Sequence, residues 1–129
     1  MVLENFDLSE RAYVADLHYN ILIQIAREDK KYRAIPKYPA VERDMAVLVK
    51  DEITSMQIET IVKNTGGELL ESVKMFDMYK GKQITEGYKS VAYELVFRAE
   101  DRTLVDEEVN KIFNKVLKSL ESEIGAQLR

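Results

Sequence analysis

The sequence predicts an α+β fold in which an antiparallel sheet is covered on one face by two helices, in the order βαββαβ. Three observations predict it. Short segments have apolar residues at alternate positions, which is typical of strands. Two longer segments have apolar residues three and four positions apart, and each ends at a glycine. Between them lie two strand-like segments joined by a loop with two glycines. This arrangement is a ferredoxin-like sandwich.

The composition is that of a globular protein, with 46% hydrophobic and 33% charged residues over 129 positions. This length accommodates one domain with a core plus an additional segment. Cysteine is absent, which removes disulfides and thiolate nucleophiles and favours the cytoplasm. The first residues lack the pattern of a signal peptide, and no apolar segment is long enough to span a bilayer. We therefore expect a cytoplasmic protein without a membrane partner.

The front of the chain is interpreted as a remnant of another domain. Residues 11–19, RAYVADLHY, predict a strand, and residues 21–26 predict a short helix. No neighbouring strand-like segment is available to pair with this strand. Pro36 and Pro39 then interrupt regular structure. Residues 1–36 are therefore expected to be the end of a preceding, larger domain with a linker, and residues 37–129 the domain itself.

The domain is expected to begin with a strand followed by a helix. Residues 43–49, RDMAVLV, alternate as a strand does. Thr54 followed by Gln57 is a capping-box pattern, which predicts the N-terminus of a helix. That helix is expected to carry an apolar stripe and to end at a glycine pair. The stripe and the glycines are Ile58, Ile61, Val62, Gly66 and Gly67.

A long hairpin, a second helix and a closing strand complete the prediction. Residues 69–79 and 88–98 alternate as the two strands of the hairpin. Residues 106–124 have helical spacing, with acidic residues in the first turn, where the helix dipole favours them, and Gly125 after the last turn. Residues 126–129 remain for a short strand.

The more apolar strand faces are predicted to be buried under the helices. They carry Met45, Val47, Val49, Val91, Tyr93, Leu95 and Phe97. On the opposite, open face, the small residues Ala46, Ser90 and Ala92 would leave a shallow floor for a planar group. Arg43 and Lys89 are expected at the edge of this floor. Small residues are equally common on open faces that bind nothing, so both interpretations stay open at this point.

The hairpin loop, FDMYKGKQITEGYKS at 76–90, combines glycines with aromatic and basic residues. Aromatic faces beside positive charge suit a polyanion that carries flat bases. A polar loop with solvated lysines is the alternative. The formal net charge of −4 argues against a protein that grips nucleic acid by bulk electrostatics, because phosphate neutralisation needs a surplus of Lys and Arg. Any such contact is expected to be local or to depend on positive charge from elsewhere.

The sequence predicts neither catalytic residues nor a metal site. His18 is the only histidine, and no serine or acid is placed beside it by sequence. The acids at 106–108 diverge in direction on a helix, so they suit the helix start rather than a metal. The phosphate-binding patterns GxxxxGK[ST] and GxGxxG are absent.

Four motifs carry a resemblance to a known family. They are KYPAVERDMAVLV at 37–49, FDMYKGKQITEGYKSVAYELVF at 76–97, RTLVDEEVNKIFNKVL at 102–117 and GAQLR at 125–129. The chain from residue 37 onward resembles the ferredoxin-fold anticodon-binding domain at the C-terminus of bacterial phenylalanine–tRNA ligase β subunits. Residues 1–36 resemble the segment that precedes it in those subunits, which implies that they are the end of a catalytic-like core with a linker.

This resemblance implies a module that binds the anticodon stem and loop of tRNA(Phe) on its open sheet face. It implies a parent (αβ)2 enzyme, with an α subunit and a second β subunit as partners, that carries out ATP-dependent aminoacylation. ATP and Mg²⁺ are expected in the parent, and no cofactor in this chain. The alternative is a ferredoxin-like regulatory or assembly module that binds a small ligand or a protein partner.

The resemblance also implies site residues. The matching motif positions are Arg43 with Asp44, Tyr79 with Gly81, and Lys89 with Ser90. The expected floor comprises Asp44, Ala46, Ser90 and Ala92. The expected phosphate or edge contacts are Arg43, Tyr79, Lys80, Lys82, Lys89 and Arg98. Because the family often has Thr where this chain has Val105, Asp106 is expected to cap the last helix instead.

Overall fold

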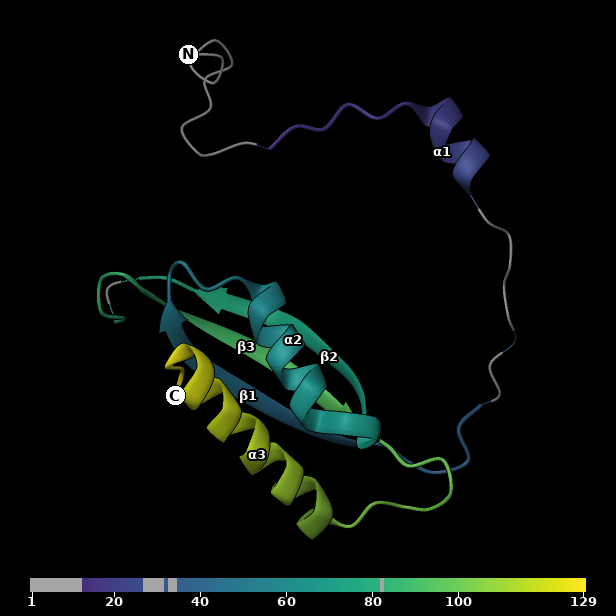
Figure 1. The fold of residues 1–129 in the computed structure, drawn as a ribbon, viewed down its shortest axis with the longest axis vertical. Helices are drawn as coiled ribbons and strands as arrows, with labels where there is room; N and C mark the ends of the chain where they lie inside the picture. Colours follow the sequence, from purple (N-terminus) through teal and green to yellow (C-terminus); the bar gives the residue numbers. More distant parts are fainter. Residues whose placement is uncertain (1–12, 27–31, 33–34, 82) are drawn as a thin grey trace. The chain divides into compact units, whose positions relative to one another are not determined.

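The computed structural model describes residues 13–26, 32, 35–81 and 83–129 (Figure 1). The chain divides into two units, Met1–Ala34 and Ile35–Arg129.

In the first unit, helix α1 (Tyr19–Ile25) confirms the short helix predicted from residue 21 and starts two residues earlier. The strand predicted over 11–19 is wrong over residues 13–18, which have no regular structure; residues 11 and 12 lie outside the described part. A strand is stable only when another strand satisfies its backbone groups, and the described residues of this unit offer none.

The second unit has the predicted βαββαβ order. Its strands are β1 (Val41–Lys50), β2 (Leu70–Tyr79), β3 (Tyr88–Phe97) and β4 (Gln127–Leu128), and its helices are α2 (Ser55–Gly66), the short 3-10 helix η2 (Gly67–Leu69) and α3 (Asp106–Ile124). The strands form one antiparallel sheet in the order β2-β3-β1-β4. Both α2 and α3 lie on the same face of it (Figure 1). The predicted ferredoxin-like sandwich is confirmed.

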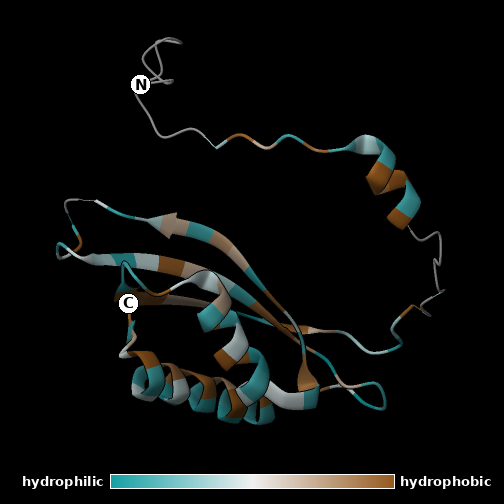
Figure 2. Cartoon of the chain, turned by 45° about the horizontal axis from the view of Figure 1, so that its top comes forward, coloured by the Kyte–Doolittle hydropathy of each residue, from teal (hydrophilic) through white to brown (hydrophobic). Residues whose placement is uncertain are grey.

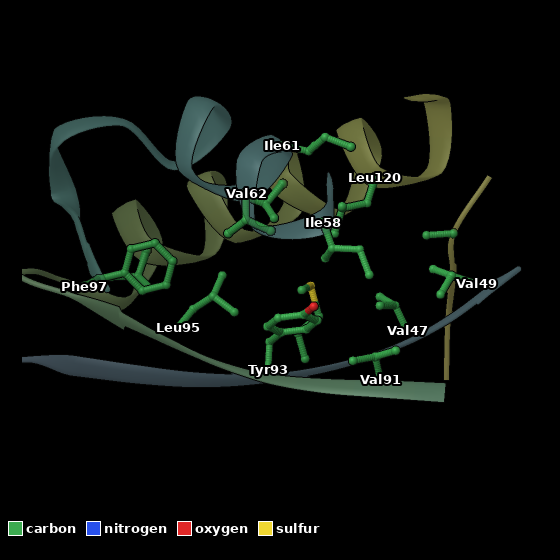
Figure 3. Packing of buried hydrophobic residues seen from close by; sticks show 14 of the residues in the cluster. Val47, Val49, Ile58, Ile61, Val62, Val91, Tyr93, Leu95, Phe97 and Leu120 are labelled. Atoms are coloured by element: carbon green, nitrogen blue, oxygen red, sulfur yellow. The ribbon is translucent and has the colours of Figure 1, made fainter. Parts of the chain in front are cut away.

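The core lies between the sheet and the two helices (Figure 3). Every residue of the apolar strand faces predicted to be buried is at most 2% exposed. Ile58, Val62, Val109, Val116 and Leu120 cover them from the helices. In α3 hydrophilic and hydrophobic bands alternate along the helix, which is the pattern of one buried and one solvated face (Figure 2).

The pairing of the strands decides which side chains share the open face. β1 and β3 pair without interruption from Val41 opposite Phe97 to Lys50 opposite Tyr88. The pairing of β2 with β3 shifts between Met75 and Asp77. Such a bulge changes the side to which the following side chains point. As a result Met75 lies opposite the buried Tyr93, whereas Asp77 lies opposite Ala92 on the open face.

The ends of the helices agree with the sequence at three of four positions. At α2 the capping box is confirmed, since the Thr54 backbone N–H donates to Gln57 Oε1 at 2.8 Å and the Gln57 N–H donates to Thr54 Oγ1 at 3.3 Å. α2 ends at the glycine pair, and Gly125, with φ of 65°, ends α3. The predicted Asp106 cap is wrong. Val105 is the N-cap residue, and its N–H donates to Glu108 Oε2 at 3.3 Å.

Candidate nucleic-acid interface

The open face is built of cross-strand rows that run from β2 through β3 to β1. Residues directly opposite one another in an antiparallel sheet point to the same side. One row contains Tyr79, Ser90 and Leu48, the next contains Asp77, Ala92 and Ala46, and a third contains Lys74, Glu94 and Asp44. The β1 and β3 members alternate with core residues and therefore point away from the helices, and the β2 members lie opposite them in the same rows.

The structure brings the predicted floor together, with one difference. Ala46 and Ala92 lie directly opposite each other on the two central strands, and Ser90 belongs to the adjacent row. Asp44 lies in the row on the other side, opposite Glu94. Both alanines are half-buried, but Ser90 is only 5% exposed. Ser90 is therefore largely inaccessible to solvent where it lies, between its cross-strand neighbours Leu48 and Tyr79.

Arg43 and Lys89 do not lie at the edge of the open face as expected. They alternate with the open-face residues and point to the side of the helices. There Arg43 Nη2 bonds Asp106 Oδ1 at 2.5 Å, and Lys89 Nζ donates to the backbone carbonyl of Asp51 at 2.9 Å. The sequence already indicated that these two side chains point toward the helices, because each residue is two positions from a core residue of the same strand. Their contact with RNA stays a prediction.

The other predicted cations also have partners within the protein. Lys80 Nζ bonds Asp51 Oδ2, while Arg98 bonds Glu71 Oε2 at 2.7 Å and donates to the carbonyl of Tyr38 at 2.5 Å. Lys82 lies outside the described residues. Exposed ion pairs contribute roughly 0–1 kcal/mol, so a phosphate can compete with the carboxylates for these side chains.

Tyr79 supplies an aromatic face beside the floor, and the loop that follows holds it. Its side chain is 40% exposed. The phenol end lies against the backbone of Gly81, where a Cβ atom would approach the Tyr79 hydroxyl to 2.5 Å. Gly81 therefore matters here because it leaves room for the ring.

Two open-face residues were missed by the sequence reasoning. Asp77 ends the row of the two alanines because of the bulge in β2. Arg129 follows β4 and donates its backbone N–H to the carbonyl of Ala46 at 3.0 Å. Its guanidinium carbon lies 5.9 Å from the centroid of the Tyr79 ring. The closing strand was expected, but its register against β1 was not, and no local pattern would have found this contact.

A hollow of about 550 Å³ lies beside the hairpin loop. It is lined by Asp51, Lys80, Gly81, Ile84, Thr85, Glu86, Gly87 and Tyr88. Asp51 has one carboxylate oxygen that is buried without a hydrogen-bond partner in the described part of the chain. The lining contains two acids, Asp51 and Glu86, and one lysine, Lys80, which already pairs with Asp51. It therefore favours neither an anion nor a cation.

Neither a metal site nor a membrane span is found where the structure is described. Over 13–26, 32, 35–81 and 83–129, no three potential metal-ligating residues (His, Cys, Asp or Glu) cluster. None of the helices within these ranges is both long and apolar enough to cross a membrane. The chemistry that the open face offers is therefore stacking on small and aromatic side chains, with charged groups around it.

Comparisons with known proteins agree with this geometry. Residues 36–129 match the family described as the ferredoxin-fold anticodon binding domain.

The chain is also similar to longer proteins named phenylalanine–tRNA ligase beta subunit. The one from Clostridium tetani is 53% identical over 128 residues, which are 99% of this chain and 16% of that protein. The one from Clostridium acetobutylicum is 48% identical with the same coverage, and the one from Bacillus subtilis is 42% identical over 98% of this chain and 16% of its own length. The chain spans about one sixth of the length of these relatives. Over residues 36–129, it belongs to the family of ferredoxin-fold anticodon binding domains.

Proposed function

We propose that this chain binds the anticodon stem and loop of tRNA(Phe) through the open face of its sheet, as part of a phenylalanine–tRNA ligase β subunit. The observation that carries the proposal is the pair Ala46 and Ala92, side by side on the central strands and flanked by the exposed ring of Tyr79. A base can lie flat on such a surface, and stacking on an aromatic side chain contributes about 1–3 kcal/mol per base.

The charge of the face sets the strength of binding. Asp44, Asp77 and Glu94 surround the alanines, and the whole chain carries a formal charge of −4. These carboxylates repel phosphates, so most phosphate contacts must come from other parts of the parent enzyme. We expect the isolated chain to bind an anticodon stem-loop with a dissociation constant in the high micromolar range or weaker, and the affinity to fall as salt is added.

The names of the relatives, which are beta subunits of a ligase, and the small share of their length that this chain spans support a proposal for the parent assembly. We propose a cytoplasmic (αβ)2 enzyme that aminoacylates tRNA(Phe) with ATP and Mg²⁺. In it, the α subunit and a second β subunit are partners, and this chain contributes recognition of tRNA rather than catalysis.

An NMR titration tests the proposal. Adding an RNA stem-loop with the tRNA(Phe) anticodon to the labelled chain is expected to shift the amide signals of Ala46, Tyr79 and Ala92. Ala92→Gln places a long side chain on the floor and is expected to weaken binding at least tenfold. Ser72→Gln adds the same side chain to the exposed β2 strand at the far end of the open face, opposite Val96, and is expected to leave binding unchanged. Equal effects of the two variants would contradict a base-binding floor.

One observation favours the alternative of an assembly module. The edge strand β2 exposes three large apolar side chains, Met75, Phe76 and Met78, which are 40–57% exposed. An edge strand with exposed apolar residues can pair with or pack against another protein. Amide shifts confined to α3, or none at millimolar RNA, would favour this function over RNA binding.

A further inference from the structure

We propose that Arg129 occupies the base-stacking place on Tyr79 in the free protein and that an incoming base must displace its guanidinium. This inference rests on the proposed function, because it concerns how the same face receives a base. It assigns a role to Arg129, which lies at the β4 edge of the sheet, whereas Tyr79 lies on β2 at the opposite edge.

The register of β4 brings Arg129 onto the open face. Val47 and Leu48 lie opposite Leu128 and Gln127, and the hydrogen bond from the Arg129 N–H to the Ala46 carbonyl continues this pairing by one residue. Arg129 therefore shares the row of Ala46 and Ala92 and points to the same side.

The arginine side chain crosses the floor to reach Tyr79. β4 and β2 are the two edges of the sheet, with β1 and β3 between them. Neighbouring strands are about 4.8 Å apart, so these edges are roughly 14 Å apart. A contact of 5.9 Å between guanidinium and ring is possible only if both side chains lean inward over the central strands. The alanines at 46 and 92 leave that path free, which gives the small residues a role in the unliganded state as well.

At the observed spacing, no base fits between the guanidinium and the ring. Stacked planar groups lie about 3.5 Å apart, so a base between two planes needs a separation of about 7 Å. The guanidinium carbon lies 5.9 Å from the centroid of the ring. A base that stacks on this face of Tyr79 must therefore move the guanidinium from its place.

The burial of Ser90 links the position of Tyr79 to the floor. Ser90 points to the open face and lies directly opposite Tyr79 and Leu48, yet it is only 5% exposed. A ligand that contacts Ser90 therefore has to move a neighbouring side chain. Tyr79, whose ring the guanidinium of Arg129 contacts, is one of these neighbours.

The balance of the two interactions favours the base. A cation–π contact at an exposed site changes an equilibrium about two- to fivefold. Stacking of a base on an aromatic side chain changes one by about fivefold to more than a hundredfold. The base therefore displaces the arginine, but Arg129 lowers its apparent affinity by about two- to fivefold.

The experiment uses the full chain and two arginine variants. Adenosine, which has a base but no phosphate, is titrated by NMR so that the lost positive charge has no phosphate to attract. Arg129→Gln is expected to bind adenosine about two- to fivefold more tightly than the unchanged chain. Arg102→Gln removes the same charge at the exposed segment before α3, where Arg102 pairs with Glu108, and is expected to leave the affinity unchanged. Unchanged or weaker binding by Arg129→Gln would overturn the inference.

The side-chain Nε–Hε signal of Arg129 provides the second readout. In the free protein, the ring of Tyr79 is expected to shift this signal, and Tyr79→Leu is expected to abolish that shift. Adding the anticodon stem-loop is expected to abolish it too. RNA binding with shifts at Ala46 and Ala92 but an unchanged Arg129 signal would overturn the inference and leave the proposed function intact. Displacement by adenosine without any binding of the stem-loop would support the inference and overturn the proposed function. If neither adenosine nor the stem-loop shifted the signals of Ala46 and Ala92, both the inference and the proposed function would be overturned.

Discussion

At the scale of single residues, the buried Tyr93 shows how the core controls the chemistry of one hydroxyl. The side chain is fully buried between the sheet and the helices (Figure 3). The hydroxyl donates to the carbonyl of Ser55 at 3.5 Å, which is a weak bond. Burial, assisted by the negative charge of Glu59, raises the pKa of Tyr93 to about 12.

This raised pKa predicts a loss of stability at high pH. An unfolded tyrosine ionises near pH 10, whereas Tyr93 keeps its proton up to about pH 12 in the folded state. Between these values the folded state binds more protons, so its free energy of unfolding falls as pH rises, by roughly 2–3 kcal/mol in total. Urea unfolding at pH 9 and pH 11.5 measures the loss.

Two tyrosine variants separate this effect from other ionisations. Tyr93→Phe is expected to lose less stability between the two pH values than the unchanged chain. Tyr13→Phe, at a side chain that is 86% exposed, is expected to lose as much as the unchanged chain. An identical decline in all three proteins would show that Tyr93 ionises freely in the folded state.

At the scale of elements, local residues determine where the helices begin and end. α2 has its capping box, and α3 begins after a residue that cannot cap through its side chain. Asp106, the first residue of α3, instead bonds Arg43 of β1, which ties the start of this helix to the sheet. The two helices thus use different means to secure their first turns.

The cap of α2 makes a measurable contribution. Thr54→Ala removes the hydroxyl that accepts from the Gln57 N–H and is expected to lower the free energy of unfolding by about 1 kcal/mol. Thr60→Ala removes a hydroxyl within the same helix that donates to the Met56 carbonyl, and is expected to be neutral or slightly stabilising, because alanine favours a helix interior. Urea denaturation measures both. A cost for Thr60→Ala equal to that of Thr54→Ala would contradict a specific role of the cap.

At the scale of the whole molecule, stability resides in the second unit. All core residues belong to the unit Ile35–Arg129, and every described side chain in 13–26 is exposed. Exposed side chains contribute little hydrophobic free energy, because folding removes little of their surface from water. The first unit is therefore not needed to complete the core.

This predicts that residues 35–129 fold without the preceding segment. Their midpoint of thermal unfolding is expected to agree with that of the full chain within about 2 °C, since removal of residues 1–34 exposes none of the core described here. Circular dichroism of the two proteins measures it, and retained binding of the stem-loop provides a functional check. A clearly lower midpoint for the shorter protein would show that the first unit stabilises the domain.

The order of elements, the buried strand faces and the ends of α2 were predictable from the sequence. These features follow from period, capping and glycine positions, which act over a few neighbouring residues. The strand predicted over 11–19 was wrong over its described part. Alternation is a local pattern, but a strand also needs a second strand to pair with. The tRNA function came from the resemblance, and the matched family agrees with it.

The side chains around the floor became known only from the pairing of the strands. The sequence selected Ala46, Ser90 and Ala92, but not the bulge that places Asp77 beside Ala92 or the register that brings Arg129 to Tyr79. Both depend on hydrogen bonds between strands that are distant in the sequence. A one-residue change in pairing would point each side chain to the other face. The placement of Ala46 and Ala92 on the open face could be predicted residue by residue, whereas the position of Arg129 is set by the pairing of all four strands.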